Sequence, residues 1–264
     1  MFATKVTSPD KAAVIQRMLE ALEVPRDATL LVHSAFKGFA RDGYDADAAL
    51  DALIDYMAPG TLLMPTMSWR FVKPDKPFFD ELETPSNTGI LTERFRRRHA
   101  SRRSLHPTHS VAGRGARVDH LLGSHYLDET PCSPLSPFGL LAGDGAHVVM
   151  MGVGMDCCTL IHHVEEMIAP ELYLRPPEQC ESYTCRDRHG GQVTVRLRRH
   201  LFLPRDYWQF QDRLAATGRL KAFRCDNSIC LGFPASAMVE VVTERLRDRP
   251  DAIIARPGQR YRMM

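Results

Sequence analysis

Two short apolar segments separated by a helical pattern constrain the fold of this chain more than any other feature. Residues 29–33 (TLLVH) and 61–65 (TLLMP) are apolar without alternating with polar residues. Between them, residues 46–57 carry apolar side chains at helical spacing, and a Pro-Gly pair at 59–60 ends that pattern. Strands that are buried on both faces and joined through a helix form a parallel βαβ unit. The pattern therefore predicts an α/β protein.

Later segments extend this prediction to a complete architecture. Residues 147–151 (HVVMM) predict a third buried strand, 192–197 a half-exposed strand, and 235–246 an amphipathic helix. A further helix is expected from Ser8 to about residue 22. We expect a three-layer α/β sandwich with a largely parallel or mixed central sheet and helices on both faces. No linker or internal repeat divides the sequence, so residues 1–264 are expected to form one domain, although the pattern changes beyond about residue 177.

The composition excludes several classes of protein. The 34 basic and 32 acidic residues give a net charge of +2, which is too balanced for a protein that grips nucleic acid. A local run of arginines in residues 94–103 is interpreted as the solvated end of a helix. No apolar run approaches the roughly 20 residues that span a bilayer, and residues 1–10 do not have the pattern of a secretion signal. Seven cysteines in a chain of this length fit a reducing compartment, so we expect a cytoplasmic protein. We expect it to be a monomer or a homodimer.

Polar residues follow three of the predicted strands at the point where each strand ends. They are His33 and Ser34, then residues 66–68, then residues 156–159. In open parallel sheets, ligands bind in the crevice beyond the carboxyl ends of the strands. The sequence therefore predicts that its functional site lies at this edge of the sheet.

The helix expected after the third strand carries the strongest candidate for chemistry. Asp156 is predicted to cap it, and its apolar face gathers Leu160, Ile161, Val164, Met167 and Ile168. His162 points away from that face, and Glu165 lies three residues further on. A carboxylate one turn from a histidine fixes the tautomer of the ring, so this pair is a workable general base. A solvated His-Glu pair on a helix surface is the alternative.

His163 and Glu166 form a second pair with the same spacing, and the helical wheel alone does not choose between the two pairs. His163 lies nearer the apolar face, where a histidine with satisfied hydrogen bonds in the core is the common outcome. Upstream, residues 104–113 hold two more histidines, several hydroxyl groups and a glycine, but their spacing dictates no mechanism.

Five segments, taken in order, resemble a known family. They are residues 31–34 (LVHS), 60–66 (GTLLMPT), 79–96 with TPSNTG inside it, 106–110 (HPTHS) with Gly113, and 133–165 with MGVG and Thr159-x-x-His162-x-x-Glu165. Together they resemble the antibiotic N-acetyltransferases, whose best known members acetylate the 3-amino group of aminoglycosides. The likeness spans about residues 29–166, and the last third of the chain matches weakly. The family loop usually has His-Ser-Ser-Leu where this chain has His33-Ser34-Ala35-Phe36.

The resemblance implies direct transfer of an acetyl group from acetyl-CoA to an amine, with His162 as the base and Glu165 orienting it. We expect no metal in this chemistry. The side chains expected to bind acetyl-CoA are His33, Ser34, Ser68, His106 and Ser110. Those expected to bind the acceptor are Asp80, Thr159 and Glu166. An acidic loop could hold a polycationic aminoglycoside or could simply be solvated; it contains Asp75, Asp80, Glu81 and Glu83. A different small-molecule amine stays open as the acceptor.

Two rival chemistries rest on cysteines. Cys157 and Cys158 lie at a predicted helix N-terminus, which would suit a thiol-dependent acyltransferase or hydrolase, although buried structural cysteine is the more common outcome. Two Cys-x4-Cys pairs could together hold a structural zinc ion; they are Cys180 with Cys185 and Cys225 with Cys230. We do not favour this zinc site, because x2 spacing is the more common form.

Overall fold

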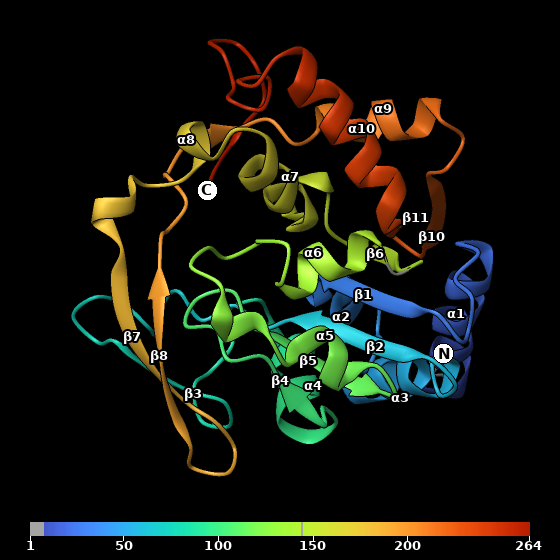
Figure 1. The fold of residues 1–264 in the computed structure, drawn as a ribbon. Helices are drawn as coiled ribbons and strands as arrows, with labels where there is room; N and C mark the ends of the chain where they lie inside the picture. The colour runs from blue at the N-terminus through green and yellow to red at the C-terminus, as the bar shows by residue number, and fades with distance from the viewer. Residues whose placement is uncertain (1–7, 144) are drawn as a thin grey trace.

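The structure, a computed structural model, describes residues 8–143 and 145–264. In this part of the chain, seven strands form one mixed sheet with the order β10-β11-β6-β1-β2-β5-β4 (Figure 1). Their bounds are β10 (Lys221–Cys225), β11 (Ser228–Pro234), β6 (His147–Met151), β1 (Thr29–Ser34), β2 (Thr61–Pro65), β5 (Val111–Gly115) and β4 (Arg102–Arg103). The central strands β6, β1 and β2 are parallel, and the flanking pairs are antiparallel.

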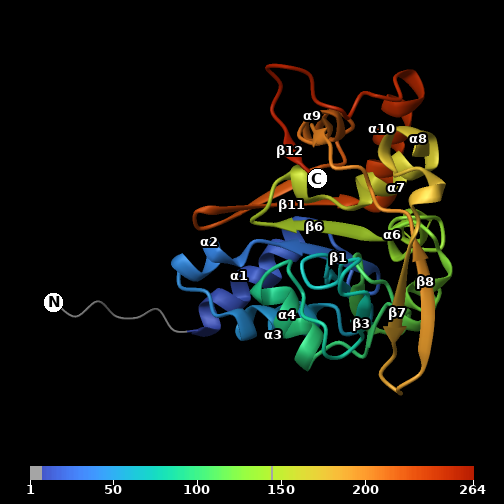
Figure 2. The same cartoon turned by 90° about the vertical axis from the view of Figure 1, so that its left-hand side faces the viewer.

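Helices cover both faces of this sheet, as the sequence predicts (Figure 2). One face carries α1 (Ser8–Ala21), α2 (Phe36–Arg41), α3 (Ala46–Tyr56) and α4 (Ile90–Arg98). The other face carries α5 (Val118–Leu122), α6 (Pro137–Ala142), α7 (Leu160–Ile168), α9 (Gln209–Ala216) and α10 (Ala235–Asp248). Along β1, Leu30 and Val32 enter the first core, whereas Leu31 enters the second. Burial on both faces explains why the strand is apolar throughout.

Smaller elements lie beside the main sheet, and most of them come from the segment beyond residue 170. Strands β3 (Phe78–Asp80), β7 (Glu181–Arg186) and β8 (Gln192–Leu197) form a second sheet with its own small core, and β9 (Pro204–Arg205) pairs with β12 (Arg262–Met263). The short helix α8 (Pro170–Tyr173) follows α7. Along β8, Val195 and Leu197 are buried while Gln192, Thr194 and Arg196 are exposed, which confirms the predicted half-exposed strand. No helix in the described ranges combines the length and the apolar character that crossing a membrane requires.

The helix with the candidate base begins later than predicted. Gly154 to Cys158 first turn as a 3-10 segment, in which the Cys157 and Cys158 amides donate to Gly154 and Met155. The α-helix α7 therefore starts at Leu160, with Thr159 rather than Asp156 at its N-cap position. The carboxylate of Asp156 instead pairs with Arg262 at 3.0 Å. Met167 is 50% exposed, so it does not belong to the buried face of this helix.

The arginine run is not a uniformly solvated helix end. Arg94 and Arg98 of α4 pair with Asp47 at the surface, as the solvated interpretation expects. Arg103 is 2% exposed, and its guanidinium donates to the carbonyl oxygens of Thr66 and Thr84 at 2.8 and 2.5 Å. Nearby backbone oxygens thus satisfy a charge that the sequence pattern places in solvent.

Candidate active site

The carboxyl ends of β6, β1 and β2 lie at one edge of the sheet because these three strands are parallel neighbours. Helix α7 follows β6 from this edge. Its apolar residues pack into the core beneath α10, and its polar residues are buried as well: His162 is 8% exposed and Glu165 is 0% exposed. The pair is therefore not the solvated surface pair of the alternative interpretation.

His162 and Glu165 form a direct hydrogen bond. Nδ1 of His162 lies 2.8 Å from Oε2 of Glu165 and 2.8 Å from the hydroxyl of Tyr207. The Tyr207 hydroxyl also donates to Oε1 of Glu165 at 2.9 Å. A carboxylate beside Nδ1 favours the tautomer that carries its proton on Nδ1, which leaves the lone pair on Nε2. This arrangement can accept a proton at Nε2 while the far side of the ring stays fixed.

A buried arginine keeps the carboxylate ionised. Nε of Arg205 donates to Oε1 of Glu165 at 2.9 Å, and both side chains are fully buried. Burial by itself would raise the pKa of Glu165, but the charges of His162 and Arg205 outweigh it and hold that pKa at about 2. Arg205 is anchored in turn, since its Nη1 donates to the Leu201 carbonyl at 2.9 Å. The ion pair is therefore part of the packed interior rather than a surface contact.

A second His-Glu pair lies against the first. Nε2 of His200 is 2.7 Å from Oε1 of Glu166, and the ring of His200 stacks on the ring of His162 with centroids 4.3 Å apart and planes 18° apart. Oε1 of Glu166 also accepts from the amide of Cys132 at 2.9 Å. Burial raises the pKa of Glu166 to about 7 and lowers the pKa of His200 well below its ordinary value.

The sequence leaves two His-Glu pairs open, and the structure distinguishes them. Nδ1 of His163 lies 2.7 Å from the carbonyl oxygen of Cys132, and no hydrogen bond in the described part of the chain joins His163 to Glu166. His163 is a core histidine with a backbone partner, as its place near the apolar face predicts. Glu166 is instead the partner of His200, which comes from a distant loop.

The loop 106–110 lies next to these pairs. The ring of His109 approaches the rings of His162 and His200 edge-on, at centroid distances of 6.4 and 5.5 Å. Ser68 is tied to this loop, because its hydroxyl donates to the carbonyl of Pro107 at 2.8 Å. His106 accepts the amides of Thr108 and His109 at Nδ1, while its Nε2 is buried without a hydrogen-bond partner among the described residues. Two predicted cofactor residues, Ser68 and His106, are thus brought to one loop.

The remaining predicted site residues have varied surroundings. At the end of β1, Nε2 of His33 and the hydroxyl of Ser34 are buried and find no hydrogen-bond partner within residues 8–143 and 145–264. The hydroxyl of Ser110 donates to the Thr66 carbonyl and accepts from Arg103, so it is sealed in the interior. Thr159 is buried at the start of α7, but its side chain does not cap the helix.

Two of the four carboxylates in the acidic loop, Asp80 and Glu81, are neutralised by the chain itself, whereas Asp75 and Glu83 are exposed. Oδ2 of Asp80 accepts from Arg186 at 2.5 Å, and its Oδ1 accepts the amides of Leu82 and Glu83 at 2.8 Å. Burial opposes ionisation of Asp80, but these partners outweigh it and lower its pKa. Arg188 pairs with Glu81 at 2.6 Å in the same way. Neither carboxylate is solvated, so the interpretation of this loop as simply solvated is wrong for Asp80 and Glu81.

The cysteines do not meet in a single site. Cys185 is buried in the core of the small sheet, whereas Cys225 and Cys230 lie in the main core that α1 covers. Within the described ranges, the side chains that come within 4.8 Å of one another as potential metal ligands form two other groups, Cys132-Glu166-His200 and His162-Glu165-His200. The four cysteines of the predicted zinc pairs belong to neither group.

The structure also bears on the thiol chemistry considered for Cys157 and Cys158. Cys158 is fully buried, and this burial raises the pKa of its thiol to about 12. Burial raises the pKa of Cys157 as well, although Arg262 lies 2.8 Å from its sulfur. Neither thiol has the lowered pKa that a catalytic cysteine requires.

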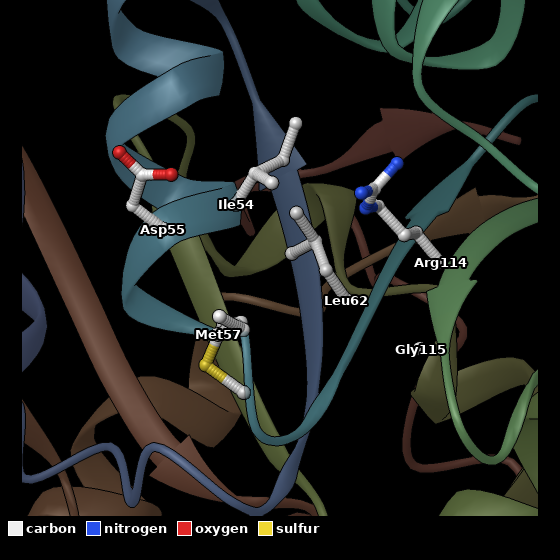
Figure 3. Close-up of a pocket in the computed structure, with 7 residues that line it drawn as sticks. Ile54, Asp55, Met57, Leu62, Arg114 and Gly115 are labelled. Atoms are coloured by element: carbon white, nitrogen blue, oxygen red, sulfur yellow. The ribbon is translucent and has the colours of Figure 1, made fainter.

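Two hollows on the surface lie away from the two His-Glu pairs. The first has a volume of about 200 Å³ and lies between α3 and β2; Figure 3 shows Ile54, Met57, Leu62 and Arg114 around it. The second runs along α4 beside Ile90 and Arg97. Neither hollow is lined by a residue of the His-Glu pairs.

Three residues of this site were not predicted from the sequence: His200, Arg205 and Tyr207. They come from the segment between β8 and α9, which lies 38 to 45 positions beyond His162. No spacing or motif links this segment to α7. Only a general requirement pointed to such partners, namely that a buried carboxylate needs a cation or a donor nearby.

The fold is that of the aminoglycoside acetyltransferases. It is similar to the structure of AAC(3)-IVa in complex with a gentamicin, with a TM-score of 0.78 and 22% identity over 97% of this chain and 94% of that chain. It is also similar to AAC-IIIb in its binary complex with CoASH, with a TM-score of 0.74 and 19% identity over 94% of this chain and 98% of that chain. At these identities the likeness establishes the fold.

Sequence comparison establishes the family. Residues 31–247 match the aminoglycoside 3-N-acetyltransferase family, and the chain belongs to it. Aminoglycoside N(3)-acetyltransferase VII of Streptomyces paromomycinus is 28% identical over 171 residues, which cover 58% of this chain. The matched region spans 59% of the length of that relative.

Proposed function

We propose that the protein transfers an acetyl group from acetyl-CoA to an amino group of an aminoglycoside-type acceptor, with His162 as the general base. The observation that carries this proposal is the buried His162-Glu165 pair at the carboxyl edge of the sheet. Nδ1 of His162 is hydrogen-bonded to Glu165 and Tyr207, so Nε2 is the nitrogen free to take a proton. Membership of the acetyltransferase family supports the same reaction.

The reaction balances without a covalent enzyme intermediate. The acceptor nitrogen attacks the thioester carbonyl carbon, a C–N bond forms, and Nε2 of His162 takes a proton from the nitrogen. The C–S bond then breaks, and the imidazolium returns the proton to the sulfur, which leaves as the free thiol of CoA. The raised pKa values of Cys157 and Cys158 favour this direct route over a thiol intermediate.

The roles of the surrounding residues follow from their placement. Buried polar atoms that lack a partner among the described residues can bind a ligand without losing an existing hydrogen bond, and His33, Ser34 and His106 each have one. We assign these residues to the acetyl-CoA side, together with Ser68 in the same loop region. AAC-IIIb, a protein of the same fold, binds CoASH in its solved structure. Ser110 lies behind Arg103 and would act only through that contact.

The acceptor side is assigned to Thr159 and Glu166, which flank His162 on α7. AAC(3)-IVa, which shares the fold, was solved with an aminoglycoside bound. In this chain, an aminoglycoside that approached Asp80 would have to compete with Arg186 for the carboxylate. The acceptor panel used in the test must therefore include simpler amines.

The test is an acetyl-CoA consumption assay over aminoglycosides and simpler amines. With the best acceptor, His162→Ala is expected to lower kcat by about 10²- to 10⁴-fold, because general-base catalysis contributes about that much. Binding of acetyl-CoA, measured by calorimetry, should change little. Cys158→Ser is the control for the thiol route and should keep its activity. A His162→Ala enzyme within a few-fold of wild type would refute the assignment, and loss of activity in Cys158→Ser would favour the thiol route.

A further inference from the structure

The catalytic ring proposed above has a second histidine against its face. The rings of His162 and His200 are nearly parallel, with centroids 4.3 Å apart. His200 is itself fixed, because its Nε2 bonds to Glu166 and the same carboxylate oxygen accepts the Cys132 amide. The proton-transfer step uses only His162 and Glu165, and Glu166 is assigned above only to acceptor binding, so His200 has no role yet.

We propose that His200 is a positioning residue for acetyl transfer. Held in place by Glu166, it fixes the plane of the His162 ring so that Nε2 points at the acceptor amine. The Glu166 carboxylate also balances the positive charge that His162 acquires during the reaction. This proposal rests on the proposed function, since it assumes that His162 is the base.

The geometry supports the positioning role. A bond at Nδ1 fixes one edge of an imidazole, but the torsion about Cβ–Cγ has a broad energy profile and lets the ring swing. Glu165 and Tyr207 hold that edge of His162. The stacked ring of His200 supplies a flat surface against one face, and His109 approaches edge-on at 6.4 Å. Together these contacts leave the ring a single orientation.

The charges around the stack support the second role. The groups that face the two rings are Glu165 and Glu166 from α7, Arg205 and Tyr207 from the segment before α9, and His109 with Cys132 from two other loops. Burial and the neighbouring His162 lower the pKa of His200, which therefore stays neutral when His162 is protonated. A neutral ring avoids repulsion across the stack, and the Glu166 anion bonded to it attracts the new charge.

A second histidine stack in the same protein provides a matched comparison. His106 and His125 stack with centroids 4.3 Å apart and planes 22° apart. The partners of His125 are the Ser104 hydroxyl at 2.9 Å and the Pro131 carbonyl at 3.1 Å. This stack has nearly the same geometry as the stack of His162 and His200, but both hydrogen-bond partners of His125 are uncharged. His125→Phe therefore controls for the loss of a buried, stacked histidine.

The experiment compares His200→Ala, His200→Phe, Glu166→Gln and His125→Phe in the full-length protein. The readouts are kcat, KM for acetyl-CoA, the pH profile of kcat/KM, the melting temperature, and the 15N shifts of the His162 ring. His200→Ala should lower kcat by about 10- to 100-fold through misorientation, with KM for acetyl-CoA within about threefold. His200→Phe restores a flat surface and should recover part of kcat.

Glu166→Gln and His125→Phe separate a positioning role of His200 from a packing role. Glu166→Gln should lower kcat/KM relative to wild type above pH 7, where Glu166 is ionised, and the two profiles should converge at lower pH, because only the Glu166 anion can attract the charge on protonated His162. His125→Phe should lower the melting temperature but leave the pH profile unchanged. If His200→Ala keeps kcat within about twofold, or if His125→Phe shifts the profile as Glu166→Gln does, the proposal is overturned.

The failure of the proposed function would be visible separately. If wild-type protein transfers no acetyl group to any amine while it binds acetyl-CoA, the reaction assignment fails. The 15N shifts still test the positioning role in that case. His200→Ala should then change the single tautomer signature of His162 to an averaged one, and an unchanged signature would contradict the role of His200.

Discussion

Replacement of Glu165 by glutamine tests whether a buried charge network holds the candidate base. Arg205 is fully buried, and its ionic partner in the structure is Glu165 at 2.9 Å. Glutamine keeps the size of the side chain but removes the carboxylate charge that pairs with the buried guanidinium. Removing one member of a buried ion pair costs about 3–5 kcal/mol of stability.

The pKa of Glu165 reports the net effect of its whole surroundings, in which the charges of His162 and Arg205 outweigh the cost of burial. That pKa is about 2 in place of the ordinary 4.5, and the difference of about 2.5 units corresponds to about 3 kcal/mol at 1.36 kcal/mol per unit. A depressed pKa stabilises the fold above pH 4.5, and this contribution disappears as the pH falls toward 2. The variant should therefore be about 3 kcal/mol less stable than wild type at pH 7, and the gap should narrow below pH 4.5.

The assay is urea unfolding followed by circular dichroism at pH 7 and pH 3.5, with acetyl transfer measured on the folded protein. Glu171→Gln makes the same substitution at an exposed position of α8 and should leave stability within about 0.5 kcal/mol of wild type. Activity of Glu165→Gln should fall about 10²-fold or more, because the ring loses its tautomer partner. A loss of less than about 1 kcal/mol at pH 7 would refute the account of the Arg205-Glu165 pair.

Two further predictions concern buried charged groups. Burial raises the pKa of Glu166 to about 7, so its ionisation destabilises the fold, and the stability present below pH 4.5 is lost as the pH rises through 7. Glu166→Gln should therefore be more stable than wild type at pH 8, by up to about 3 kcal/mol, and the gain should shrink at pH 5; a constant difference in urea midpoints would contradict this. Arg103→Lys should lower the stability by about 2–4 kcal/mol, because an ammonium cannot reach the separate carbonyls of Thr66 and Thr84; a thermal midpoint within about 2 °C of wild type would contradict this.

The three central strands of the main sheet could be predicted because their signals are local. The strands at residues 29–33, 61–65 and 147–151 are apolar throughout, and each matches an observed strand to within one residue. The start of α7 was predicted less well. A capping residue at 156 fits the sequence, but the chain turns as a 3-10 segment until Cys158, and local pattern does not distinguish these two turns.

Charged residues mark the limit of this reasoning. Arg103 belongs to an arginine run that favours solvent, and yet it is buried because carbonyl oxygens from residues 66 and 84 surround its guanidinium. Asp80 and Glu81 belong to an acidic loop, and yet Arg186 and Arg188 of the small sheet neutralise them. Both outcomes depend on contacts between segments that are far apart in sequence, and no local periodicity reports them.

The candidate site likewise combines a part that the local sequence predicts with a part that depends on contacts between distant segments. The spacing of His162 and Glu165 is a local property of one helix, and it predicts their hydrogen bond. The same spacing on an exposed helix would give a solvated pair with little chemical use. What makes the pair a candidate base is the enclosure formed by Tyr207, Arg205 and His200, which all come from a segment distant in sequence from α7.

The contrast between local spacing and long-range contacts explains which inferences the family resemblance can support. The segments up to residue 166 contain the proposed base and its carboxylate, so they point to a reaction type. The later segments supply Arg205, which pairs with Glu165, and Arg186, which pairs with the Asp80 first assigned to the acceptor. The ionised form of Glu166 opposes folding and yet lies against the base. A buried carboxylate that costs stability is typical of functional sites, which supports the proposed action of Glu166 on the His162 ring.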